Sequence, residues 1–185
     1  MSGFLSKLFG GNKSEKDVKQ ILPLVKKTNE FFAQYQALSN DQLRGKTAEF
    51  KNRISQHLTD IDAQIANKKQ DAENLPVTDI NGRDAIYKDV DELKKDRDKK
   101  IEEILQQILP EAFAVVKETS RRFKENESIE SSATELDREL AAKKNHISIE
   151  GDRAIYKNSW SAAGGTITWN MVHYDVQLIG GMVLH

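Results

Sequence analysis

The chain has 185 residues, a length that fits one domain or part of one. Its 28 basic and 29 acidic residues leave a formal charge of −1, so no net field points to nucleic acid or to an acidic partner. Cysteine is absent, which excludes disulfides, zinc–thiolate sites and thiol catalysis. The four histidines lack metal-ligand spacing and no nucleophile or dinucleotide motif occurs, so the sequence predicts no metal site and no catalytic residue.

Residues 1–11 are predicted to form an amphipathic N-terminal segment. Its apolar side chains share one helical face: Phe4, Leu5, Leu8 and Phe9. The apolar part is short and is broken by Lys7, which argues against a signal peptide. Two interpretations stay open, a segment that lies in a membrane interface and a chain end that packs on its own protein.

Residues 12–56 are predicted to be a helical lead-in. Apolar residues recur at helical spacing on both sides of Pro23, which is expected to interrupt the first helix. Ser39 and Gln42 have the spacing of a capping box and predict the start of a second helix. The aromatic residues of this segment are assigned to the core.

Residues 57–104 are strongly polar and are predicted to be a helical insertion. Every residue from 94 to 100 is charged, which is typical of a solvated helix face. Chain breaks are expected at Leu75-Pro76 and at Asn81-Gly82.

Residues 105–123 are predicted to contain a separate helix. Pro110 fits the first turn of that helix and should push Leu109 out of helical geometry. Arg121 and Arg122 at its end are candidates for a phosphate contact, although a basic pair at a helix C-terminus ordinarily complements the helix dipole.

Residues 124–168 are predicted to be a second insertion, polar at first and then rich in β-structure. Leu136 and Leu140 indicate a short helix, and the residues around Gly151 indicate a β-hairpin. A further strand is expected after a Gly164-Gly165 turn. The run Ile149–Lys157 in this segment echoes Ile80–Lys88, and the flanking periodicity predicts a strand for the later copy and a helix start for the earlier one.

Residues 169–185 allow two readings on physical grounds alone. Asp175 suits the cap of a short helix, but Gly180 and Gly181 would each cost about 1 kcal/mol inside it. Alternatively, the glycine pair forms the turn of a hairpin between two apolar strands. Periodicity does not decide between these two structures.

Three segments resemble the SecA family, the ATP-driven motors of bacterial protein export. They are Ala37–Lys51, Leu109–Arg122 and His173–Leu184, and they occur in the family's order. The resemblance implies that residues 169–185 begin the first nucleotide-binding domain with a short helix. It also implies a fold class, mainly α with a small β-hairpin element, as the N-terminal portion of an α/β P-loop (RecA-like) motor domain.

The same resemblance makes Gln177 the glutamine of the family's Q-motif. A side-chain amide can accept a hydrogen bond from the N6 amine of adenine while it donates to N7. Tyr174 stands where the family often has Phe, Met171 agrees with the family pattern, and Val172 replaces a frequent Arg. The implied cofactor-binding residues are therefore Gln177, Tyr174 and Met171, and the implied cofactor is ATP.

The sequence contains no G-x-x-x-x-G-K-[S/T] phosphate loop, which Mg²⁺-ATP binding requires. We therefore expect a fragment that ends before this loop and does not hydrolyse ATP alone, while its parent is an ATPase. By resemblance, the parent's partners are the SecYEG channel, preproteins and acidic phospholipid, on the cytoplasmic face of the inner membrane, and a homodimer stays open. The alternative is a non-enzymatic helical interaction module.

Overall fold

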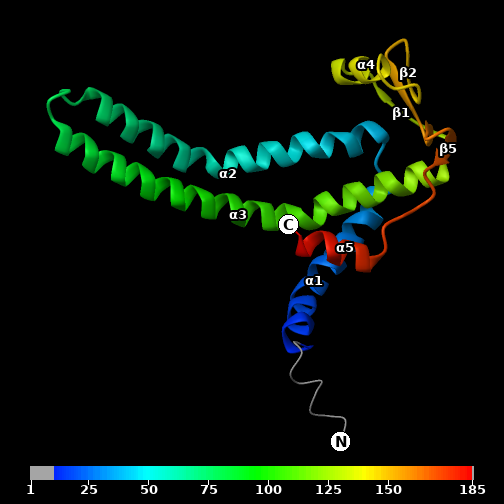
Figure 1. Ribbon diagram of the computed structural model, residues 1–185, viewed down its shortest axis with the longest axis horizontal. Coiled ribbons are helices and arrows are strands. Elements are labelled where there is room, and N and C mark those ends of the chain that lie inside the picture. The colour runs from blue at the N-terminus through cyan, green and yellow to red at the C-terminus, as the bar shows by residue number, and fades with distance from the viewer. Residues whose placement is uncertain (1–10, 185) are drawn as a thin grey trace, which may run out of the picture. The chain divides into compact units, whose positions relative to one another are not determined.

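The computed structural model describes residues 11–184, so the amphipathic segment predicted at residues 1–11 lies almost entirely outside the described residues. Within that range the chain is mainly helical with small antiparallel sheets, as predicted (Figure 1). The helices are α1 (Gly11–Tyr35), α2 (Asn40–Asn74), α3 (Ile80–Glu125), α4 (Glu135–Ala141) and α5 (Asp175–Val183). The strands are β1 (Ser128–Ser132), β2 (Ile147–Glu150), β3 (Arg153–Lys157), β4 (Ser159–Ala162) and β5 (Gly165–Thr168).

The chain divides into two compact units, each with its own apolar core. One unit consists of Met1–Lys46 together with Pro110–His185, and the other is Thr47–Leu109. The second unit therefore covers the predicted polar insertion and a few residues on either side of it.

The unit Thr47–Leu109 is a pair of helical arms, one from α2 and one from α3, that lie side by side (Figure 1). Their apolar seam consists of Leu58, Ile61, Ile65 and Val90, with Ile54, Leu93 and Ile101 packed against it. Ion pairs such as Lys68–Asp89 also join the arms, at 2.6 Å, but they are exposed and contribute little to stability. The seam therefore provides most of the stability of this polar unit.

The connection between α2 and α3 is short and is closed by Asp79. The Asp79 Oδ1 atom accepts a hydrogen bond from the backbone N–H of Gly82 at 3.0 Å, which satisfies one free donor in the first turn of α3. The break predicted at Leu75-Pro76 is present. The break predicted at Asn81-Gly82 is wrong, because the cap at Asp79 starts the helix before these residues.

Two prolines lie inside helices, contrary to the prediction. Pro23 is within α1, and α3 runs without a break through Pro110. Proline removes one backbone hydrogen bond, a cost that buried packing can offset. Pro110 and its neighbours Ile108, Leu109 and Ala114 are all buried, so tertiary contacts hold the helix on both sides of the ring.

The core of the other unit joins α1 and the first turns of α2 to α3. It consists of Tyr35, Leu43 and Ala114, with Phe31, Phe32, Leu38 and Val115 packed around them. The predicted capping box at the start of α2 is confirmed, since Ser39 N donates to Gln42 Oε1 at 2.8 Å and Gln42 N donates to Ser39 Oγ at 3.2 Å.

Two small antiparallel sheets follow α3. The first has the order β1-β3-β2, and β1 pairs with β3 so that Ile129 faces Tyr156. The predicted β2–β3 hairpin is confirmed, whereas β1 was missed because its sequence is polar. The second sheet is the β4–β5 hairpin, and its turn lies at Ala163 and Gly164, one residue before the prediction. Both turn residues have positive φ, 49° and 80°, as the tight hairpin turn requires.

Candidate functional site

α5 (Asp175–Val183) decides between the two readings of the C-terminal segment in favour of a helix. A Cβ atom added at Gly181 would lie 2.7 Å from Phe113 Cε1 on α3, so the missing side chain permits close packing between these helices. Leu178 and Met182 on the same helix are buried. This burial offsets the propensity cost of Gly180 and Gly181.

Gln177 lies in the first turn of α5 and is exposed to solvent. Its Oε1 atom accepts a hydrogen bond from the backbone N–H of Tyr174, the N-cap residue, at 2.8 Å. This contact fixes the amide plane against the helix end. The N-cap residue is Tyr174 and not Asp175, and Tyr174 is 75% exposed.

Asp175, the first residue of α5, connects this helix to two others. Its Oδ1 atom accepts a hydrogen bond from Asn29 Nδ2 of α1 at 3.0 Å. Lys117 Nζ of α3 lies 3.5 Å from the same oxygen and donates to Asn29 Oδ1 at 2.7 Å. One lysine, one amide and one carboxylate therefore hold three helices together at the N-terminal end of α5.

Met171, the third predicted site residue, is held by a different contact. Its carbonyl oxygen accepts a hydrogen bond from the indole of Trp169 at 2.9 Å. Next to it, His173 Nδ1 lies 3.2 Å from Ser120 Oγ of α3. The structure thus brings Tyr174 and Gln177 together directly, and it fixes Met171 through the segment that leads to α5.

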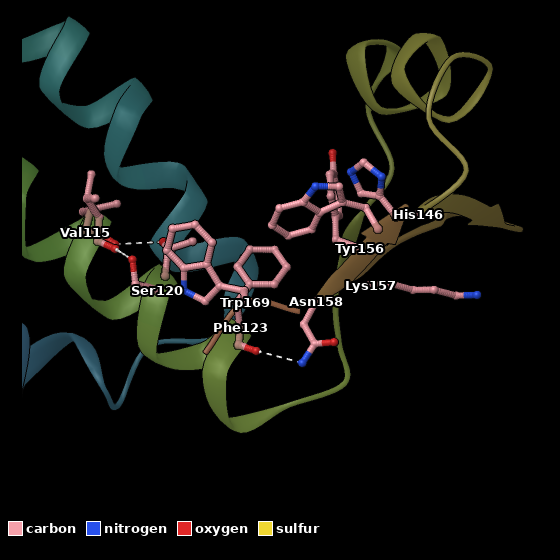
Figure 2. Close-up of a pocket in the computed structure, with 11 residues that line it drawn as sticks. Val115, Ser120, Phe123, His146, Tyr156, Lys157, Asn158 and Trp169 are labelled. Carbon is pink, nitrogen blue, oxygen red and sulfur yellow. Dashed lines mark hydrogen bonds between the residues drawn. The ribbon is translucent and has the colours of Figure 1, made fainter. Parts of the chain in front are cut away.

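A cavity of about 340 Å³ lies between α3 and the small sheets (Figure 2). Trp160 and Trp169, the two tryptophans of the chain, both line it, together with Phe123, His146 and Tyr156. Figure 2 shows Trp169 and Phe123 close together near α3, with His146 and Tyr156 coming from the sheet side. Gln177 is not among the lining residues, so this cavity is separate from the predicted adenine contact.

The polar side chains of the cavity wall are largely engaged within the protein. Thr119 Oγ1 and Ser120 Oγ donate to the carbonyls one turn earlier in α3, at 2.8 Å and 2.9 Å. Asn158 Nδ2 donates to the carbonyl of Phe123 at 3.2 Å, as drawn in Figure 2. The cavity therefore presents mainly carbon surface and suits an apolar group better than a charged one.

Arg121 and Arg122 are engaged with a buried carboxylate. Burial alone would raise the pKa of Glu118, but hydrogen bonds from Arg121 and Arg122 outweigh it, so the pKa is lowered. Arg122 is itself buried and donates to Tyr35 O, Leu38 O and Asn40 Oδ1. Arg122 lies in the last turn of α3, as the dipole prediction assumes, and it also donates to carbonyl groups at the C-terminal end of α1, which the sequence did not predict.

The sequence profile of the SecA DEAD-like domain matches residues 5–185. The chain belongs to the SecA family. This finding confirms the resemblance on which the assignment of residues 169–185 depends.

Curated SecA proteins align with almost the entire chain. Protein translocase subunit SecA of Flavobacterium psychrophilum is 50% identical over 179 residues, which is 97% of this chain. The protein of the same name from Porphyromonas gingivalis is 47% identical over 182 residues, and that from Cytophaga hutchinsonii is 44% identical over 185. The chain spans only 16% of the length of each of these SecA relatives.

The comparison of this chain with solved structures found no match. Among residues 11–184, no helix combines the length and the apolar character that crossing a bilayer requires. Within the same part of the chain, no three His, Asp or Glu side chains are grouped as a metal site.

Sequence reasoning missed Asn29 and Lys117, the residues that dock α5. Lys117 lies in the segment that resembles the SecA family most closely, but its partners are 88 and 58 positions away in the numbering. No local spacing rule links them. The cavity had a weak signal, since both tryptophans of the chain lie within a ten-residue stretch.

Proposed function

We propose that this chain is the N-terminal part of an ATP-driven protein translocase and that Gln177 contacts the adenine of ATP. The observation that supports this is the position of the Gln177 amide, exposed at the N-terminal end of a helix that is docked on α1 and α3. An exposed, oriented amide is the group that adenine recognition needs. In this proposal Tyr174 packs near the base and Met171 completes the contact.

The remaining functions belong to the longer protein. Its phosphate loop would hold the triphosphate and Mg²⁺, and ATP hydrolysis would drive preproteins through the SecYEG channel. The relatives are named protein translocase subunits, which supports this assignment. The protein would act at the cytoplasmic face of the inner membrane, in contact with acidic phospholipid, and would be able to form a homodimer.

Within this framework, residues 57–104 and 124–168 are insertions into a more compact family pattern. Residues 105–123 and 169–185 would then form a continuous base for the nucleotide-binding domain. The core that α1 shares with α3, and the docking of α5 on both helices, support this division.

The test is Gln177→Ala in the complete gene product, with ATP affinity as the measurement. Loss of the amide should weaken ATP binding by about tenfold. Gln42→Ala is a matched control, because Gln42 makes the same capping contact at the start of α2, with its Oε1 atom 2.8 Å from Ser39 N. An unchanged ATP affinity in Gln177→Ala would remove Gln177 from the nucleotide site.

A further inference from the structure

Lys117 is an unusual lysine, because it is almost entirely withdrawn from solvent. Only 11% of its side chain is exposed, and its ammonium group lies over the ring of Phe32, 5.1 Å from the centroid. A lysine this buried is retained only where its charge meets partners. Its partners are Asn29 Oδ1 at 2.7 Å and Asp175 Oδ1 at 3.5 Å.

Hydrogen bonds connect Lys117 to Asp175 through Asn29, so the arrangement of these three residues has a defined geometry. Asn29 bridges the other two residues, since it accepts from Lys117 and donates to Asp175 at 3.0 Å. Asp175 is 60% exposed on its side chain, so its attraction to Lys117 is screened by water. The principal effect of the triad is therefore to fix position, because it ties the first residue of α5 to α1 and α3 at once.

The position of Asp175 determines the position of the side-chain amide of Gln177. Gln177 follows two residues later in the same helical turn, and its Oε1 atom is bound to Tyr174 N, immediately before Asp175. Backbone geometry in this turn is rigid, so a movement of Asp175 moves Tyr174 and Gln177 with it.

We propose that Lys117 is a positioning residue for adenine recognition, acting through Asn29 and Asp175. This inference rests on the proposed function of Gln177. Lys117 does not touch the nucleotide itself; it sets where the amide of Gln177 is presented. Replacement of Lys117 should weaken the recognition of adenine more than it weakens the binding of the phosphates.

The experiment measures nucleotide dissociation constants of the complete gene product carrying Lys117→Met, Gln177→Ala, or both. ATP is compared with purine riboside triphosphate, which lacks the N6 amine, and with 7-deaza-ATP, which lacks the N7 acceptor. Lys117→Met should weaken ATP binding by about tenfold and reduce the preference for ATP over both analogues. The double variant should be no weaker than Gln177→Ala alone, because the two residues act on one contact.

Two variants separate positioning from simple loss of structure. Lys117→Arg keeps a cation beside Asp175 and should restore most of the preference for ATP. Lys124→Met removes an exposed lysine from the same helix and should leave the nucleotide constants unchanged. If Lys117→Met unfolds the protein, Asp175→Asn tests the same contact from the other side.

The outcomes are distinguishable. If Gln177→Ala changes ATP affinity and base preference but neither Lys117→Met nor Asp175→Asn does, the positioning role is overturned and the proposed function stands. If Gln177→Ala has no effect, the proposed function itself fails. If Lys117→Met lowers thermal stability while the ratio of ATP to analogue affinity stays constant, Lys117 is structural only.

Discussion

Arg122 Nη2 of α3 lies 2.7 Å from the carbonyl oxygen of Leu38, just beyond the end of α1. The same nitrogen donates to Tyr35 O at 3.0 Å, so a buried guanidinium satisfies carbonyls that the end of a helix leaves without partners. Its Nε atom donates to Glu118 at 2.7 Å, which balances the charge. Through these contacts α3 fixes the direction in which the chain leaves α1 and enters α2.

Arg122→Met should therefore destabilise the chain strongly. The change removes the cap on α1 and leaves Glu118 buried with only one of its two arginine partners, which should cost about 3 kcal/mol. The measurement is urea unfolding followed by circular dichroism. Arg121→Met is the control, and it should cost clearly less because Arg121 is more exposed. Equal losses in both variants would contradict the capping role of Arg122.

The glycine pair in α5 offers a matched test of helix docking. Gly181→Ala would place a methyl group 2.7 Å from Phe113 Cε1, so the ring or the helix must move, at a cost of about 1 kcal/mol or more. Gly180→Ala meets nothing within 4 Å and should stabilise the helix by up to about 1 kcal/mol. Hydrogen exchange of the α5 amides reports both effects, and protection lost in Gly180→Ala would argue against this packing.

Asp137 should make stability depend on acid pH. Hydrogen bonds from Arg44, with both contacts under 3 Å, lower the pKa of Asp137 below its ordinary value of 3.8, and this outweighs the effect of burial. A lowered pKa means that the ionised form stabilises the fold above about pH 4 and that this stability is lost as the pH falls below it. Asp137→Asn should therefore flatten the acid limb of a plot of unfolding free energy against pH. An acid limb identical to that of the parent chain would refute this.

Tyr156 should ionise late in an alkaline titration. Burial, followed by the hydrogen bond to Asp137 and its charge, raises the pKa of Tyr156 from 10.0 to about 12. The protonated hydroxyl of Tyr156 therefore stabilises the folded state below about pH 10, and this stabilisation is lost as the pH rises toward 12. Ultraviolet absorbance of tyrosinate should show one late transition that disappears in Tyr156→Phe. In Asp137→Asn the transition should move to lower pH, and a fixed position would exclude Asp137 as a cause.

Limited proteolysis should cut first between α2 and α3. Val77 in this connection is 82% exposed, whereas the segment from Ile108 to Ala114 is largely buried. Exposed connections are preferred cleavage sites. Elastase followed by mass spectrometry should find cleavage near Val77 before any cut within residues 109–123. The reverse order would contradict the proposal that residues 57–104 are an insertion and that residues 105–123 belong to the base of the nucleotide-binding domain.

Local signals were reliable where both partners lie within one helical turn. Ser39 and Gln42 predicted the start of α2, because a capping box is complete within four residues. The β2–β3 hairpin was also correctly predicted, since its strands and turn are contiguous. The strand β1 was missed for the opposite reason, because its partner β3 lies more than 20 residues further along the chain and its own sequence is polar.

The two copies of a nearly identical run show how context overrides local sequence. Ile80–Lys88 starts α3, whereas the last five residues of Ile149–Lys157 form β3. Both contain Ala-Ile-Tyr-Lys, so intrinsic propensity is the same in the two places. The cap at Asp79 and the seam around Val90 select the helix, and pairing with β1 and β2 selects the strand.

The sequence by itself determined the start of α2 and the hairpin after α4, and through family resemblance it proposed an adenine contact at Gln177. Only the tertiary structure decided that α3 continues through Pro110, that Arg122 caps α1, and that Lys117 and Asn29 hold α5 in place. The physical reason is separation along the chain. Capping boxes and turns are interactions between near neighbours, whereas buried charges and close helix packing depend on residues that only folding brings together.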